Sequence, residues 1–128
     1  FQTPQPSENG GKIYVSGTTL FQVERGKGKH ITDISTPEAP VKKAFIKVLG
    51  SQEVAVKDGL IYTNNMNDLV ILDLSPSSVT VVKRVPAFKN MGNTSLPPER
   101  GSFECPDKTK GTVVGWHKKM LNNPKCEY

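Results

Sequence analysis

The chain has 128 residues, which is enough for one domain with a core of its own. Its formal net charge is +5, but the 17 basic residues are scattered and no RNA-binding strand signature with interleaved aromatics occurs, so we expect no nucleic-acid partner. No apolar run approaches the roughly 18 residues of a membrane-spanning helix, so we expect no membrane span.

Residues 1–11 carry no hydrophobic periodicity, and we interpret them as a linker. The chain begins at Phe1 and shows no signal peptide. In a lipoprotein of the cell envelope, such a linker would join an upstream lipid anchor to the folded domain. A chain that simply starts at this point is the alternative. We expect a single β-repeat domain over residues 12–128.

The clearest pattern is a strand at Leu60–Thr63, a polar turn at Asn64–Asp68 and a second strand at Leu69–Leu74. Asn and Asp tolerate the left-handed backbone conformation that tight connections require, so the turn has a chemical cause. The second strand is apolar without alternation from Leu69 to Leu72, which predicts that both of its faces are covered.

This hairpin has a second copy 40 residues earlier. Six identical pairs share that offset: Leu20 and Leu60, Ile31 and Ile71, Asp33 and Asp73, Ser35 and Ser75, Val41 and Val81, Lys43 and Lys83. The turn also recurs in kind, because Arg25–Gly28 takes the place of Asn65–Asp68 and glycine supplies the positive φ there.

Each copy divides into four short strands. We expect strands at Lys12–Val15, Thr19–Glu24, Lys29–Ile34, Val41–Val48, Glu53–Val56, Leu60–Thr63, Leu69–Leu74 and Val79–Val85. A period of about 40 residues with four strands per unit is typical of a β-propeller blade. We therefore predict an all-β fold with repeat 1 at 12–50, repeat 2 at 53–90 and a C-terminal extension of loop and strand at 91–128.

The motif Leu69-Val70-Ile71-Leu72-Asp73 resembles the core of the LVIVD repeat, which occurs in propeller-like envelope proteins of bacteria. The segments at 11–15, 24–28, 33–37 and 111–116 are similar to LVIVD lipoproteins of Bacteroidetes. The resemblance implies a cell-envelope location, which is periplasmic, outer-membrane-attached or on the cell surface. It carries over no catalytic residues, and members of the family have further repeats. The first copy departs at Lys29–Asp33, whose polar residues predict a less covered strand.

Asp33 and Asp73 each precede a large apolar residue and then a serine. A carboxylate at such a position accepts hydrogen bonds from backbone amides one or two residues later, so we predict that both cap the turn after the third strand of their repeat. Paired catalytic carboxylates are the alternative. Equivalent positions on neighbouring blades are spread around a ring, which favours the structural role.

The remaining polar candidates predict no metal or cofactor site. The oxygen-rich cluster at Asn64–Asp68 has one carboxylate and lacks the spacing of a helix-flanked calcium loop. Glu24 and Arg25 are expected to be a solvated pair. His30 and His117 have no cysteine or second histidine at ligand spacing, and we expect His30 to pack on a half-exposed strand face.

After Phe88 the pattern changes. Gly and Pro break any regular element up to Lys110, which predicts a long loop, and Thr112–His117 reads as one further strand with the only tryptophan. Cys105 and Cys126 are the only cysteines, and we predict that they form a disulfide in an oxidising compartment. Two free thiols, or a catalytic cysteine with His117 as its base, are the alternatives.

Two blades cannot close a ring, since propellers have roughly four to eight. Three arrangements would resolve this: a longer native protein, association of several chains as in the small two-blade lectins, or a sandwich-like stack with residues 88–128 over the open face. A homo-oligomer is therefore one expectation.

The leading functional hypothesis is a non-enzymatic binding or interaction module of the bacterial cell envelope, with a protein or glycan partner. A carbohydrate-binding, lectin-like module is the alternative, and its candidate aromatic residues are Tyr14, Phe21, Tyr62 and Trp116. An enzyme with its site in the 88–110 loop is the third, and no nucleophile is paired with a base there.

Overall fold

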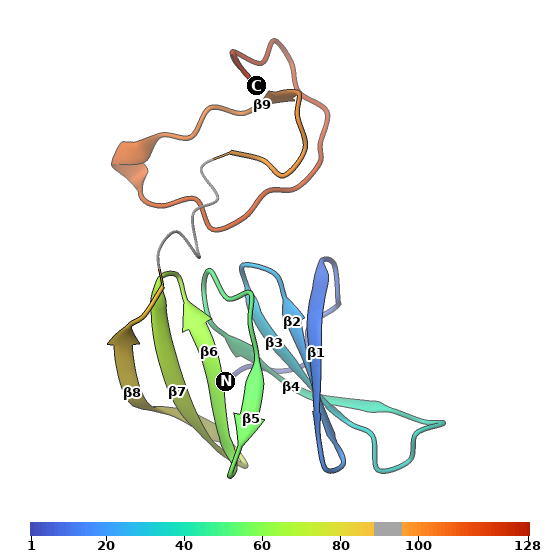
Figure 1. Ribbon diagram of the computed structural model, residues 1–128. Coiled ribbons are helices and arrows are strands. Elements are labelled where there is room, and N and C mark those ends of the chain that lie inside the picture. Colours follow the sequence, from blue (N-terminus) through green and yellow to red (C-terminus); the bar gives the residue numbers. More distant parts are fainter. Residues whose placement is uncertain (89–95) are drawn as a thin grey trace.

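Two four-stranded antiparallel sheets make up most of the molecule (Figure 1). The first sheet contains, in spatial order, β1 (Gly10–Ser16), β2 (Thr19–Glu24), β3 (Gly28–Asp33) and β4 (Val41–Lys47). The second contains β5 (Ala55–Lys57), β6 (Leu60–Asn65), β7 (Asp68–Ser75) and β8 (Ser78–Pro86). This computed structural model describes residues 1–88 and 96–128.

The predicted all-β fold with two four-stranded units is confirmed, and the strand order is the same in both. Each predicted strand in these units overlaps an observed one, and their ends differ by about two residues at most. The sheets do not close into a barrel. None of the described helical residues forms a helix long and apolar enough to cross a membrane.

The hydrophobic core lies between the two sheets. Alternation along each strand sends every second side chain toward the partner sheet. The buried apolar side chains of this core are Phe21, Val23, Ile31, Ala44, Ile46, Val48, Val54, Ile61, Val70 and Leu72. Val48 and Val54 flank the connection between the sheets, so this connection is part of the core. The face of each sheet that points toward the core is called the inner face below, and the opposite one the outer face.

The two sheets differ in register by one residue in their third strands. Asp33 pairs with Thr19, whereas Asp73 pairs with Leu60, which is the counterpart of Leu20 in the repeat. The cause is the hairpin, because three residues separate the paired Glu24 and Gly28 while two separate Asn65 and Asp68. A shift of one residue turns a side chain to the other face. The two aspartates therefore occupy different positions, although they are 40 residues apart in sequence.

The predicted turn cap is present at Asp33 and missing at Asp73. The Asp33 carboxylate accepts a hydrogen bond of 2.8 Å from the amide of Ser35, and this bond lowers the pKa of Asp33. Asp73 lies inside β7, and among the described residues its side chain makes no hydrogen bond. The turn after β7 is closed by Ser75, whose hydroxyl lies 2.6 Å from that of Ser78. The prediction for Asp73 is wrong because the register shift moves it away from the strand end.

Asp33→Ala and Asp73→Ala are therefore expected to behave differently. Loss of the Ser35 bond lowers the melting temperature of the Asp33 variant, whereas the Asp73 variant melts like the parent. Differential scanning calorimetry at neutral pH measures both. Equal melting temperatures for the two variants would contradict this assignment.

The C-terminal segment, residues 96–128, is held together by the predicted disulfide between Cys105 and Cys126. It contains a two-stranded sheet of β9 (Ser102–Phe103) and β10 (Cys126–Glu127) and a turn of 3-10 helix, η1 (Lys108–Lys110). The ring of Phe103 is buried and lies edge-on to Trp116 and to Tyr128, with centroid distances of 5.4 and 6.1 Å.

The predicted strand at Thr112–His117 is wrong. This stretch is irregular, and the pairing occurs instead between Ser102–Phe103 and Cys126–Glu127, inside the expected loop and tail. A strand needs a paired neighbour, and none of the described strands lies alongside 112–117. Residues 89–95 of the expected loop, which include the boundary between repeat 2 and the extension, lie outside the described residues.

The C-terminal segment lies beyond one end of the two sheets and does not cover an outer face, so it does not form the sandwich-like stack that was one of the three arrangements considered (Figure 1). It touches the first sheet at Gly26, in the β2–β3 hairpin, where an added Cβ would overlap the carbonyl of Val114. Gly26 also has φ +75°, so both the backbone conformation and the close approach require glycine.

Candidate functional site

The N-terminal segment, residues 1–9, crosses the outer face of the first sheet. The backbones of Gln2 and Phe45 exchange two hydrogen bonds of 2.7 and 3.0 Å, which adds a short strand-like contact to the β4 edge. The ammonium of Lys42 donates to the carbonyl of Gln5 at 3.0 Å. The stretch interpreted as a linker from its sequence is thus packed on the sheet, and its last two residues, Gly10 and Gly11, already belong to β1.

Glu24 anchors this segment. Its side chain is buried, and its carboxylate accepts hydrogen bonds from the amide of Glu8 at 3.2 Å, from the amide of Asn9 and from the hydroxyl of Ser7 at 3.2 Å. A further bond comes from Nε2 of His30, 2.7 Å away. Burial alone would raise the pKa of Glu24, but the bonds from His30 and the backbone amides outweigh it, so the pKa lies below its ordinary value.

The second sheet contains a matching anchor at Asn64, 40 residues after Glu24. The Asn64 side chain is fully buried, and its Oδ1 accepts from the amides of Gln52 and Glu53 at 2.8 and 3.0 Å. Its Nδ2 donates to the carbonyl of Gly50 at 2.9 Å. In both sheets, one acceptor side chain at the end of the second strand therefore holds the backbone that leads into the first strand.

His30 and Glu24 are both buried, which corrects two sequence expectations. The His30 ring is 1% exposed and contacts Phe45 with a centroid distance of 5.0 Å. A carboxylate can only accept, so His30 Nε2 carries the proton that it donates to Glu24. Nδ1 of His30 is buried without a hydrogen-bond partner among the described residues. His30 was expected on a half-exposed face and Glu24 in a solvated pair, but the N-terminal segment shields them.

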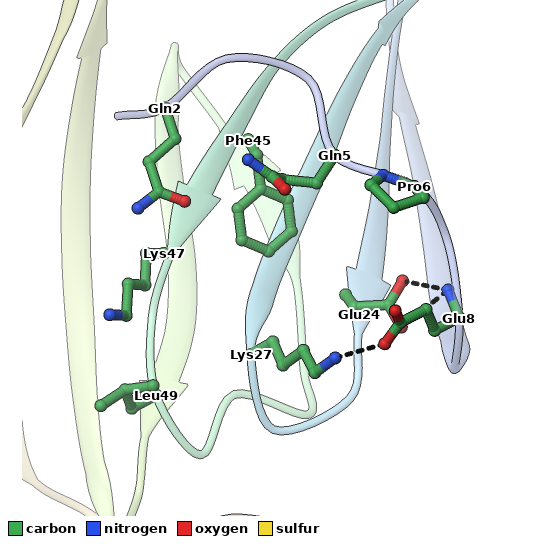
Figure 2. A pocket seen from close by; sticks show the side chains of 9 residues that line it. All are labelled: Gln2, Gln5, Pro6, Glu8, Glu24, Lys27, Phe45, Lys47 and Leu49. Carbon is green, nitrogen blue, oxygen red and sulfur yellow. Dashed lines mark hydrogen bonds and ion pairs between the residues drawn. The ribbon is translucent and has the colours of Figure 1, made fainter.

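A pocket of about 240 Å³ lies between the N-terminal segment and the first sheet (Figure 2). We call it the N-terminal pocket. The amide side chain of Gln5 lies next to the Phe45 ring, and Gln2 and Lys47 lie together on one side of that ring. Glu8 also lines it, with a carboxylate 2.5 Å from the ammonium of Lys27. This pocket combines an aromatic group, two amides and charged groups of both signs, which suits a small polar ligand.

Two of its polar groups are available to a ligand. The Lys47 ammonium and the Gln2 side-chain amide make no hydrogen bond or ion pair within the described part of the chain. Glu8 is engaged by Lys27, and Glu24 by the N-terminal amides and His30. The unpaired charge in the pocket is therefore positive, and it favours a ligand that carries an anionic group.

A second polar cluster lies buried between the sheets. Lys29 donates to the hydroxyl of Ser51, whose oxygen is 3.0 Å from that of Thr63, and all three residues are at most 1% exposed. Burial lowers the pKa of Lys29 to about 7, and the charge of Glu53 opposes this shift. A serine beside such a lysine could be an activated nucleophile in an open site. Here no substrate can reach it, so the cluster serves packing.

The oxygen-rich turn of the second sheet is occupied by protein groups. Arg84 donates to Asn65 Oδ1 and Asp68 Oδ2, both at 2.9 Å, and Asn65 Nδ2 donates to the carbonyl of Leu49 at 2.7 Å. A guanidinium thus takes the position that a calcium ion would need. Within residues 1–88 and 96–128, no group of three or more His, Cys, Asp or Glu side chains could hold a metal ion.

The aromatic residues considered for carbohydrate binding do not converge. Phe21 is in the core, Tyr14 is on the β1 edge, Tyr62 is half-buried on β6 and Trp116 packs on Phe103. Comparisons of the chain with models of protein families, with curated proteins and with solved structures found no match.

The N-terminal pocket, the buried position of Lys29 and the two anchors were not predicted from the sequence. A signal for the anchors was present, because Glu24 and Asn64 share the offset of 40 and both carry an acceptor oxygen. A comparison of identical residues does not reveal it, because one anchor is a glutamate and the other an asparagine. No comparable signal marks Phe45 or Lys47, because most of the other residues that line the pocket come from the N-terminal segment and the β2–β3 hairpin, far from them in the chain.

Proposed function

We propose that the chain is a non-enzymatic binding module of the bacterial cell envelope, with the repeat architecture of the LVIVD family. Two four-stranded units in tandem and the Leu69–Asp73 motif support the family, and the disulfide between Cys105 and Cys126 is typical of proteins outside the reducing cytosol. On this proposal the domain acts in the periplasm, on the outer membrane or at the cell surface, with a protein or glycan as its partner.

The groups that could do acid–base or nucleophilic chemistry support a binding role. The Glu24 and His30 pair and the Lys29 and Ser51 pair are each at most 2% exposed. A general base must come within hydrogen-bond reach of the proton that it removes. Because these side chains bind to one another and to the backbone, they stabilise the fold and leave the N-terminal pocket to contact a ligand.

A second candidate function, carbohydrate binding, is favoured by one observation: the unengaged Lys47 ammonium and Gln2 amide lie beside Phe45 in the N-terminal pocket. Amide groups form the paired hydrogen bonds that sugar hydroxyls require, and an ammonium binds a carboxylate. We therefore propose that the pocket takes a sugar with a carboxylate group.

A glycan array with neutral and carboxylate-bearing sugars tests the ligand class, and isothermal titration calorimetry measures the affinity of the best ligand. Lys47→Glu is expected to weaken binding at least tenfold, since it replaces an attraction by a repulsion. Lys57→Glu is the matched control, because Lys57 is also an exposed lysine on an edge strand and lies outside the pocket. Equal losses for both variants would exclude the N-terminal pocket as the site. An array without any bound sugar would exclude the carbohydrate ligand.

A further inference from the structure

The two sheets have four edge strands, β1, β4, β5 and β8. The free N–H and C=O groups of an edge strand can pair with another strand. Natural sheets prevent this with short strands, with Lys or Pro on the edge, or with a covering segment. How each of these edges is protected therefore shows where pairing with another chain can occur.

Three of the four edges are protected. The β4 edge is covered by the backbone of Gln2, which pairs with Phe45. The β8 edge carries the exposed Lys83 and ends in Pro86. It also exposes Val81 and Val82, and its other cation, Arg84, is bound to Asp68. The β5 strand has only three residues and ends in Lys57. Each edge uses a recognised means of avoiding pairing with a second chain.

The β1 edge is protected only at its start, where Lys12 lies and where the pairing with β2 is irregular between Gly10 and Ile13. This strand is seven residues long, and Ile13, Tyr14 and Val15 at its centre are exposed by 57%, 36% and 52%. Its one charged residue is Lys12, whose ammonium lies 2.5 Å from a carboxylate oxygen of Glu53. Three neighbouring large apolar residues on an unpaired edge favour strand addition, because pairing removes them from water and satisfies the backbone.

We propose that β1 pairs antiparallel with β1 of a second copy of this chain, across a two-fold axis at Tyr14. The stretch Gly11-Lys12-Ile13-Tyr14-Val15-Ser16-Gly17 reads alike in residue type from both ends. Centred on Tyr14, the antiparallel register places glycine opposite glycine, Lys12 opposite Ser16 and Ile13 opposite Val15.

This symmetry identifies a second copy as the occupant. An isologous interface requires a patch that is complementary to itself. In the register centred on Tyr14, no two like charges face each other, and two β-branched pairs flank an aromatic pair, which are favourable cross-strand combinations. The two first sheets then form one continuous eight-stranded sheet. The pairing leaves the N-terminal pocket free, because this pocket borders β4 at the opposite edge of the first sheet.

Sedimentation equilibrium over a wide concentration range is expected to give twice the chain mass of 14.0 kDa. Tyr14→Lys should convert the dimer to a monomer with an unchanged circular dichroism spectrum, since two ammonium groups would then meet on the axis. Val82→Lys is the matched control, because Val82 is a 55% exposed apolar residue on the β8 edge. This control should remain a dimer.

Cross-linking tests the register. In the described part of the parent both cysteines are in a disulfide, so Tyr14→Cys adds one reactive thiol on the axis. We expect Tyr14→Cys to oxidise to a covalent dimer and Val82→Cys to remain uncross-linked. The proposal is overturned if the parent chain stays monomeric at all concentrations. This holds even if the monomeric chain binds a separate peptide with the β1 sequence. It is also overturned by a dimer that survives Tyr14→Lys, or by cross-linking through Val82→Cys in preference to Tyr14→Cys.

Discussion

Lys29→Met is expected to stabilise the protein and to remove most of its pH dependence between pH 7 and pH 10.5. The Lys29 ammonium is fully buried, and its pKa falls from 10.5 to about 7 because burial disfavours the charged form. Methionine fills a similar volume without a charge. The hydroxyl of Ser51 keeps its contact with Thr63, so the substitution leaves no isolated polar group there.

The sign of the effect follows from proton binding. Between pH 7 and pH 10.5 the unfolded chain holds the Lys29 proton more firmly than the folded one, so the free energy of unfolding rises with pH. The difference between the two pKa values corresponds to about 5 kcal/mol. The cost of burying the charge is fully present below pH 7 and disappears above pH 10.5. The free energy of unfolding of Lys29→Met should therefore exceed that of the parent most at low pH, and the difference should shrink toward pH 10.5.

Urea unfolding of the parent and of Lys29→Met at a series of pH values measures the pH dependence of the free energy of unfolding. Lys57→Met is the control, because Lys57 is exposed and its replacement should leave the slope with pH unchanged. A Lys29→Met variant whose unfolding free energy rises with pH as steeply as that of the parent would show that the ammonium is not buried as described.

Glu24→Ala is expected to destabilise the protein by about 3 kcal/mol, because a buried network loses its acceptor. The amides of Glu8 and Asn9 and the Nε2 proton of His30 would all lose their partner. Glu24→Gln should cost less, since an amide oxygen fulfils the same task at Asn64 in the second sheet. Hydrogen exchange should show that the amides of Glu8 and Asn9 lose protection in the alanine variant.

The free energy of unfolding at acid pH provides a second measurement. The pKa of Glu24 is lowered in the folded state, so its contribution is present above the unfolded value of 4.5 and is lost as the pH falls through the folded value. In the Glu24→Ala variant, the stability should not fall with acid pH by this amount, because the contribution of Glu24 is already absent. Glu8→Ala is the control, because it removes only an exposed ion pair with Lys27, and such pairs contribute at most about 1 kcal/mol. If both variants unfold at the same urea concentration, Glu24 does not anchor the N-terminal segment.

The repeat fold could be predicted because its causes are local. Hairpin turns at Arg25–Gly28 and Asn65–Asp68, together with apolar strands between them, specify two four-stranded units wherever they occur in the chain. The disulfide could also be predicted, because only Cys105 and Cys126 are available to pair. The cap at Asp33 follows from a carboxylate two residues before an amide at a strand end.

The candidate site could not be predicted, because it depends on what packs on the strands. Lys29 and His30 make the third strand of the first repeat polar, which predicted a less covered strand, yet both are buried. The N-terminal segment covers His30, and the connection between the sheets supplies Ser51 to Lys29. Neither partner is close in sequence.

What the sequence by itself determined is therefore the eight strands of the two repeats, their order within each repeat and the covalent cross-link. The tertiary structure alone decided the register of Asp73, the burial of Glu24 and Lys29, and the pocket beside Lys47. The physical reason is the distance along the chain between the residues that interact. Turn conformation and strand alternation arise from neighbouring residues, whereas burial and hydrogen-bond satisfaction arise from whichever segment covers a face, and that segment is specified only when the whole chain has folded.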